Sequence, residues 1–226
     1  MNHIQIISAT RLSEKEFWET TALGNSLKRL TYDSVIVPKI TFNNHMGLPH
    51  IYNKGIDETS HENYLVFIHD DVWIDDYHFS RRIIEGLNVF NIIGVAGNKR
   101  RVAQQPAWAF IDTKFTWDQK SNLSGSVAHG KHPFGNISFF GPTSESCLLL
   151  DGVFLATKKE TLMRDHIQFD TQFDFHLYDM DFCRSAEKNK LSMGTWPIAL
   201  THQSGGHFGT EVWQKSYLAY LKKWGD

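Results

Sequence analysis

The sequence has few of the features that mark secreted, membrane-spanning or nucleic-acid-binding proteins. It contains only two cysteines, Cys147 and Cys183, too few for a disulfide framework or a cysteine-rich zinc site, so a reducing cytoplasm is the expected location. No apolar run approaches the roughly 20 residues that span a bilayer. The formal net charge of -2 provides no basic field for nucleic acid. We therefore expect small-molecule partners and no nucleic acid.

The composition instead supports one large domain. Hydrophobic residues make up 41% and aromatic residues 13% of the 226 residues, which is enough to bury a substantial core. The opening residues 1–11 lack the basic start and the long apolar stretch of a signal peptide. We expect a single soluble domain over residues 1–226.

Strand-like and helix-like segments alternate along the first half of the chain. Short apolar runs predict strands at residues 4–8, 33–39, 64–68 and 92–97. Apolar residues at helical spacing predict helices at residues 13–30, 47–60 and 77–90. Ser13 and Glu16 form a capping box at the start of the first helix. This alternation predicts an α/β fold with a mostly parallel, Rossmann-like sheet flanked by helices.

Regular periodicity is lost in the middle of the chain. Residues 98–145 are rich in glycine, serine, asparagine and histidine without a sustained period, so we expect a binding loop. Its Trp108, Trp117 and Phe134 fit either a stacking surface for sugar rings or a cover over one end of the core. Strand-like runs then return at 146–158 and 192–200, with helices predicted at 174–191 and 211–224.

Three acidic or histidine-containing clusters are the candidate chemical groups. In the first, His69, Asp70 and Asp71 follow the apolar strand 64–68. Ligands of open α/β sheets bind beyond the carboxyl ends of parallel strands, where carboxylates suit Mg²⁺ and a nearby imidazole favours Mn²⁺. The alternative is a polar turn that caps the helix beginning near residue 76.

The other two clusters lie near the C-terminus. Asp179 and Asp181, with Asp174 upstream, can supply a general base, or they can simply complement the dipole of a helix start. His202 and His207 flank two glycines after a strand, where a histidine can bind a metal or a phosphate oxygen, or serve structure alone.

Four segments in order along the chain resemble GT-A-fold glycosyltransferases, particularly the bacterial family-2-like group. They are "IISATR", "GLPHIYNKGIDETSHENYLVFIHDDVWI", "LLLDGVFLATKKETL" and "FDFHLYDMDFCRSAEKNKLSMGTWPIALTHQSGG". The resemblance covers most of the chain and is weakest over 98–145. It implies a nucleotide-sugar-binding half at 1–97 and an acceptor-binding half at 98–226, with loop 98–145 as acceptor surface or lid.

The resemblance also implies a role for particular residues. The donor-binding residues would be Ser8, Thr10, Arg11, Asn53, Gly55, His69 and Asp70. The D-X-D metal motif falls on 69–71, where His69 replaces the first acid, so Asp71 would bind the metal together with His202. The cofactor would be a divalent cation, Mn²⁺ or Mg²⁺. The acceptor or sugar would contact Asp151, Gly152, Asp181, Trp117 and His207.

The implied activity is transfer of a sugar from a nucleotide-diphosphate donor to a hydroxyl of a glycan or lipid-linked acceptor. Asp179 matches the base position of inverting members, while Tyr178 stands where the family has glutamate. Such a hexosyltransferase would serve polysaccharide biosynthesis in a bacterium. A metal-dependent phosphohydrolase and a non-catalytic sugar-binding module are the alternative functions.

The predicted helix 211–224 leaves two partners open. Lys215, Lys222 and Lys223 lie beside Trp213 and Trp224, a composition that fits an anionic membrane surface, here the inner face of the membrane. The apolar face of the helix can equally pack on the domain itself or on a second subunit in a homodimer.

Overall fold

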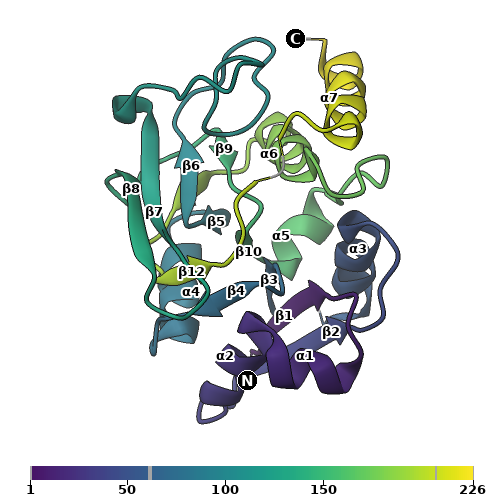
Figure 1. Cartoon of the computed structure of the whole chain (residues 1–226), viewed down its shortest axis with the longest axis vertical. Coiled ribbons are helices and arrows are strands. Elements are labelled where there is room, and N and C mark those ends of the chain that lie inside the picture. The colour runs from purple at the N-terminus through teal and green to yellow at the C-terminus, as the bar shows by residue number, and fades with distance from the viewer. Residues whose placement is uncertain (1, 61–62, 207, 226) are drawn as a thin grey trace.

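A computed structural model of the protein describes residues 2–60, 63–206 and 208–225. The chain forms two sheets with helices packed around them (Figure 1). The strands of the first sheet, in spatial order, are β11 (Met193–Thr195), β5 (Ile92–Gly94), β10 (Phe154–Lys158), β3 (Tyr64–Ile68), β1 (Ile4–Ala9) and β2 (Ile36–Thr41). Those of the second sheet are β4 (Val72–Ile74), β12 (Leu200–His202), β7 (Leu123–His129), β6 (Ala96–Asn98), β9 (Leu149–Leu150) and β8 (Asn136–Gly141), which pairs with β7.

The first sheet is mostly parallel, as the sequence predicts. Strands β2, β1 and β3 pair in parallel, and so do β5 and β11. Strand β10 lies between β3 and β5 and pairs antiparallel with both, so it alone among these strands is reversed. The α/β fold class is therefore confirmed. The sequence did not predict that β10 runs antiparallel to its neighbours.

Most helices lie close to their predicted positions. They are α1 (Glu14–Thr20), α2 (Ala22–Arg29), α3 (Leu48–Glu58), α4 (Phe79–Leu87), α5 (Lys159–Arg164), α6 (Tyr178–Lys188) and α7 (Glu211–Trp224). The helix predicted over 13–30 is instead two helices. The Thr21 hydroxyl donates to the carbonyl of Phe17 and accepts from the amide of Gly24, so Thr21 ends α1 and caps α2.

Segment 98–145 is not a loop throughout: it contains strands of 7 and 6 residues, so the loop prediction is wrong there, while its binding role stays a prediction. Strands β7 and β8 form a hairpin within it, and β7 is central to the second sheet (Figure 1). Small residues hide this strand from periodicity analysis, yet they are required by packing. A Cβ on Gly125 would lie 2.0 Å from the carbonyl oxygen of Val95, and its φ of +93° also favours glycine.

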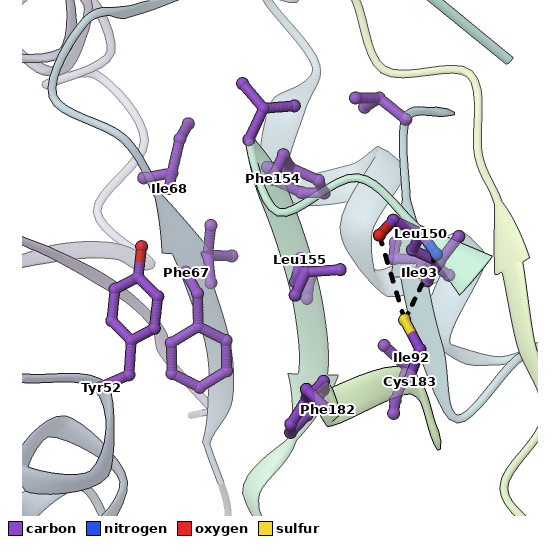
Figure 2. Close-up of a cluster of buried hydrophobic side chains, with 14 of the residues drawn as sticks. Tyr52, Phe67, Ile68, Ile92, Ile93, Leu150, Phe154, Leu155, Phe182 and Cys183 are labelled. Atoms are coloured by element: carbon purple, nitrogen blue, oxygen red, sulfur yellow. Dashed lines mark hydrogen bonds between the residues drawn. The ribbon is translucent and has the colours of Figure 1, made fainter. Parts of the chain in front are cut away.

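The core fills the space between the first sheet and its helices. Figure 2 shows Tyr52 of α3 beside Phe67 of β3, with ring centroids 5.0 Å apart. From α6, Phe182 stacks on Phe169 at 4.2 Å, and the amide of Leu150 donates to Sγ of Cys183. Helix α6 therefore packs on β9 of the second sheet and on Phe169, whose ring in turn contacts Phe67 of the first sheet at 4.9 Å.

The chain passes directly from one sheet to the other at several short segments. These are residues 69–71 between β3 and β4, residue 95 between β5 and β6, residues 151–153 between β9 and β10, and residues 196–199 between β11 and β12. We call these four segments the sheet junction. Two of them carry sequence-predicted site residues.

Helix α7 packs on the domain itself. Trp213, Tyr217 and Tyr220 are buried, and Figure 1 shows the helix beside α6. Among the described helices, none is long and apolar enough to cross a bilayer.

Candidate active site

One cavity opens at the sheet junction and at the start of α6. Its wall includes residues 69, 151–153, 175–180, 202, 204–206 and 208 together with Trp108 and Trp213. Five residues predicted from sequence therefore line one cavity: His69, Asp151, Gly152, Asp179 and His202. They come together because the sheet junction and the first turn of α6 face the same space.

His69, Asp71 and His202 form a candidate metal centre beside this cavity. One ligand atom from each of these residues lies within 4.8 Å of the other two. Oδ1 of Asp71 is 3.2 Å from Nε2 of His202, where strand β12 ends next to β4. A set of two imidazoles and one carboxylate fits Mn²⁺ better than Mg²⁺, which prefers oxygen ligands alone. The residues present therefore fit the cation that the sequence implies.

The electrostatics of this group keep the carboxylate ionised. Burial acts to raise the pKa of Asp71, but hydrogen bonding and attraction from His202 outweigh it, so the pKa lies well below its usual range. Burial acts to lower the pKa of His202, and the hydrogen bond to Asp71 and its charge reverse that effect, so the pKa is raised. Asp71 is therefore ionised at neutral pH.

Asp179 has the properties of a general base. Its Oδ2 accepts from the amide of Gly152 at 3.0 Å and its Oδ1 from the amide of Met180 at 2.8 Å. Burial, and then the charge of Asp151, raise its pKa to about 6 in spite of these hydrogen bonds. A carboxylate with a pKa this close to neutral can abstract a proton efficiently at neutral pH.

Tyr178 connects the candidate metal centre to the segment that carries Gly152. Its hydroxyl donates to the carbonyl of Gly152 at 2.8 Å and lies 2.9 Å from Nε2 of His69. Burial raises the pKa of Tyr178 well above its usual value, so the phenol remains protonated. The preceding residue, Leu177, has a φ of 64° in the left-handed region, which sets the entry of the chain into α6.

Aromatic side chains form much of the cavity wall. Phe175 stacks on the ring of His69 with centroids 5.6 Å apart, and Phe208 and Trp213 line the cavity as well. Nε1 of Trp108 donates to Oδ2 of Asp151 at 2.9 Å, which fixes both side chains. Apolar rings beside a few fixed polar groups are typical of sites that bind small molecules.

The predicted nucleotide-binding residues in β1 and directly after it lie apart from this cavity wall. Thr10 hydrogen bonds to Asp70, as expected for residues at the ends of the neighbouring parallel strands β1 and β3. Ser8 is fully buried, and its hydroxyl has no hydrogen-bond partner among the described residues, whereas Arg11 is exposed.

Asn53 and Gly55 of α3 have structural contacts within the domain: Asn53 hydrogen bonds to the backbone, and Gly55 packs against β1. Nδ2 of Asn53 donates to the carbonyl of Phe169 at 2.8 Å, and its Oδ1 accepts from the amide of the same residue at 2.9 Å. A Cβ on Gly55 would lie 2.7 Å from side-chain atoms of Ile7, so glycine is needed for α3 to approach β1. Neither residue lines the cavity.

Asp181 also lies away from the cavity, because it faces α7. Its carboxylate is 1% exposed and pairs with Nζ of Lys223 at 2.7 Å and with Nε1 of Trp224 at 2.8 Å. Trp117 is 54% exposed and stacks on Phe140, outside the cavity. The predicted residue His207 lies outside the described residues.

The pairing of Asp181 with Lys223 predicts a large effect on stability. We expect Lys223→Ala to lower the free energy of unfolding by about 1–3 kcal/mol, because it leaves a buried carboxylate with Trp224 as its main donor. Chemical denaturation measures this change. Lys222→Ala on the exposed side of the same helix is the matched control and should alter stability little. Equal stability of the two variants would contradict a structural role for the pair.

Tyr178 and Phe175 were not assigned to the site from the sequence, and Trp108 was expected only as part of a sugar-stacking surface or of a cover over the core. In the family resemblance Tyr178 stands where other members have glutamate, and this difference was the one sequence feature that could have drawn attention to it. Trp108 contacts Asp151 across 43 residues, and no local pattern marks such a contact.

The fold is shared with solved glycosyltransferases at low sequence identity. A mannosyltransferase from Pyrobaculum calidifontis in complex with GDP-Man and Mn²⁺ has a TM-score of 0.53 and 13% identity, over 99% of this chain and 64% of that chain. GalNAc-T7 with UDP, GalNAc and Mn²⁺ has a TM-score of 0.55 and 8% identity, over 100% of this chain and 48% of that chain. S. aureus TarS 1-349 in complex with UDP has a TM-score of 0.51 and 12% identity, over 90% of this chain and 61% of that chain.

At these identities the likeness establishes the fold, which is the GT-A fold expected from the sequence. The chain spans 48% to 64% of the length of the three proteins. No functionally curated protein matches it in sequence. A family model described as "Glycosyltransferase like family" matches residues 13–205, which is most of the chain. The chain therefore belongs to the glycosyltransferase-like family.

Proposed function

We propose that the protein transfers a sugar from a nucleoside-diphosphate donor to an acceptor hydroxyl with inversion at the anomeric carbon. The observation that carries this proposal is one cavity that has a buried carboxylate of raised pKa, Asp179, and a His-Asp-His group at its edge. The family supports the reaction class. The neighbours solved with UDP or GDP-Man, two of them with Mn²⁺, support the donor class and the cation.

The residues divide the work of the reaction. Asp179 removes the proton of the acceptor hydroxyl as that oxygen attacks the anomeric carbon. His69, Asp71 and His202 would hold the divalent cation, which would supply positive charge to compensate the negative charge of the departing diphosphate. Trp108, through its hydrogen bond, keeps Asp151 oriented toward the bound sugar.

The acceptor would bind along the aromatic side of the cavity. Phe175, Phe208 and Trp213 offer apolar faces that can cover a sugar ring and exclude water. The acceptor class in this proposal is a glycan or a lipid-linked saccharide. Lys215 and Lys222 on α7 are exposed, and they would face the membrane if the acceptor is lipid-linked.

A product assay tests the proposed reaction. The protein is incubated with UDP-, GDP- or dTDP-sugars and Mn²⁺, with candidate acceptors present, and both the nucleoside diphosphate and inorganic phosphate are measured. Acceptor-dependent release of nucleoside diphosphate supports transfer. Release of inorganic phosphate would indicate a phosphohydrolase, and stabilisation by free glycan without binding of any nucleotide would indicate a sugar-binding module.

The raised pKa of Asp179 predicts the pH dependence of transfer. A general base acts only when deprotonated, so kcat/KM should fall about tenfold per pH unit below a pKa of about 6 and level off above it. Steady-state kinetics between about pH 4 and pH 8 in a constant-ionic-strength buffer, roughly two units on either side of that pKa, measure the profile. A flat profile through this range would argue against Asp179 as the base.

A further inference from the structure

We propose that Tyr178 is a positioning residue that fixes the tautomer of His69, so that Nδ1 carries the lone pair offered to a cation. This inference rests on the proposed metal role of His69. Neither the family match nor the similar structures solved with UDP or GDP-Man give Tyr178 a role.

The phenol of Tyr178 has a single hydrogen, and three polar groups lie near it: the carbonyl of Gly152, Nε2 of His69 and the hydroxyl of Tyr52, which can donate its own hydrogen to the phenol oxygen. The carbonyl of Gly152 lies 2.8 Å from its oxygen and can only accept. The hydrogen between these two oxygens must therefore come from the phenol. Nε2 of His69 lies 2.9 Å from the same oxygen. Because the only phenol hydrogen is directed at Gly152, the phenol oxygen can only accept from the imidazole, so Nε2 must carry a hydrogen and donate it.

A neutral imidazole has one N–H and one lone pair. If the N–H is on Nε2, the lone pair is on Nδ1, which is then the ring nitrogen available to a metal. Histidine ligands commonly donate their other ring N–H to a nearby acceptor, which fixes the ring and its tautomer. Tyr178 supplies that acceptor here, and Phe175 stacked at 5.6 Å restrains the ring from one face.

The same arrangement connects the metal group with the base. Gly152 accepts from Tyr178 through its carbonyl and donates from its amide to Asp179 at 3.0 Å. A Cβ on residue 152 would lie 2.5 Å from the hydroxyl of Tyr178 and 2.9 Å from Cβ of Asp179. Glycine is therefore required for the first turn of α6 to reach this backbone. Tyr178, which contacts His69, and Asp179 are adjacent residues of that turn.

The tautomer is measured directly in the metal-free protein. Long-range ¹H–¹⁵N NMR on ¹⁵N-histidine-labelled protein distinguishes Nε2–H from Nδ1–H, and His69→Gln identifies the signal by its loss. We expect the Nε2–H form in the wild type and a mixture of both forms in Tyr178→Phe. An Nδ1–H form in the wild type overturns the proposal, whatever the protein binds.

Mn²⁺ affinity is the second measurement. Titration without donor should give an affinity about 10- to 100-fold weaker for Tyr178→Phe than for the wild type. Tyr217→Phe, which removes another phenol-to-carbonyl hydrogen bond, to Gln104, is the matched control and should bind as the wild type does. Equal affinity of Tyr178→Phe and the wild type overturns the proposal. A wild type that binds no Mn²⁺ refutes the proposed metal centre instead, and the NMR result then decides the tautomer alone.

Discussion

Asp179→Asn is expected to lower kcat by about 100- to 10,000-fold, which is the usual contribution of a positioned general base. The amide cannot take the acceptor proton. The donor should still bind with nearly unchanged affinity, because the proposed cation ligands His69, Asp71 and His202 remain in place. Measurement of kcat and of donor affinity on the same preparation separates loss of chemistry from loss of binding.

The Asp179→Asn variant needs a control for folding. Asparagine can accept from only one of the two backbone amides that Asp179 now satisfies, at Gly152 and Met180, so some loss of stability is expected. Asp165→Asn removes a carboxylate outside the cavity and should leave kcat unchanged. If folded Asp179→Asn retains full transfer activity, the base is another group. The acidic limb of the pH profile should also be absent from its residual activity.

Asp71→Ala is expected to weaken Mn²⁺ binding by more than about 100-fold, since loss of an outer-shell partner alone costs 10- to 100-fold. The variant removes the one anionic member of the His-Asp-His group and leaves two imidazoles. Calorimetric titration with Mn²⁺ measures the change, and transfer activity should fall with it. Treatment of the wild type with a chelator should reproduce the loss of activity, and added Mn²⁺ should restore it.

Asp76→Asn is the matched control for Asp71→Ala. Asp76 lies five residues further on, where its carboxylate accepts from the amide of His78 at the start of α4, away from the cavity. This variant should bind Mn²⁺ as the wild type does. Unchanged Mn²⁺ affinity in Asp71→Ala would show that Asp71 is not a ligand and that Mn²⁺ binds at another site.

The parts of the site that could be predicted are those with a local signal. An apolar strand that ends in charged residues marked 69–71, because burial and charge change within a few positions. The start of α6 was marked in the same way by its acidic residues, and the family resemblance selected Asp179 among them.

The parts that could not be predicted depend on contacts between distant segments. Asp179 and Asp181 are equally acidic and two positions apart, and the docking of α7 decides that Asp181 is buried against Lys223. The contact of His69 with Tyr178 spans 109 residues. Strand β7 was missed because serine and glycine, which pack closely in the second sheet, have no strand-like hydrophobic pattern.

The sheet junction has a consequence for folding. His69 and Asp71 leave the first sheet there, and His202 belongs to the second, so an intermediate in which only one sheet has formed lacks the complete group of proposed cation ligands. A cation that binds the native state alone adds about 2.7 kcal/mol to its stability at a hundred times the dissociation constant. Its binding therefore disfavours every partly unfolded state in which the two sheets have separated, and it should slow amide hydrogen exchange in both sheets together.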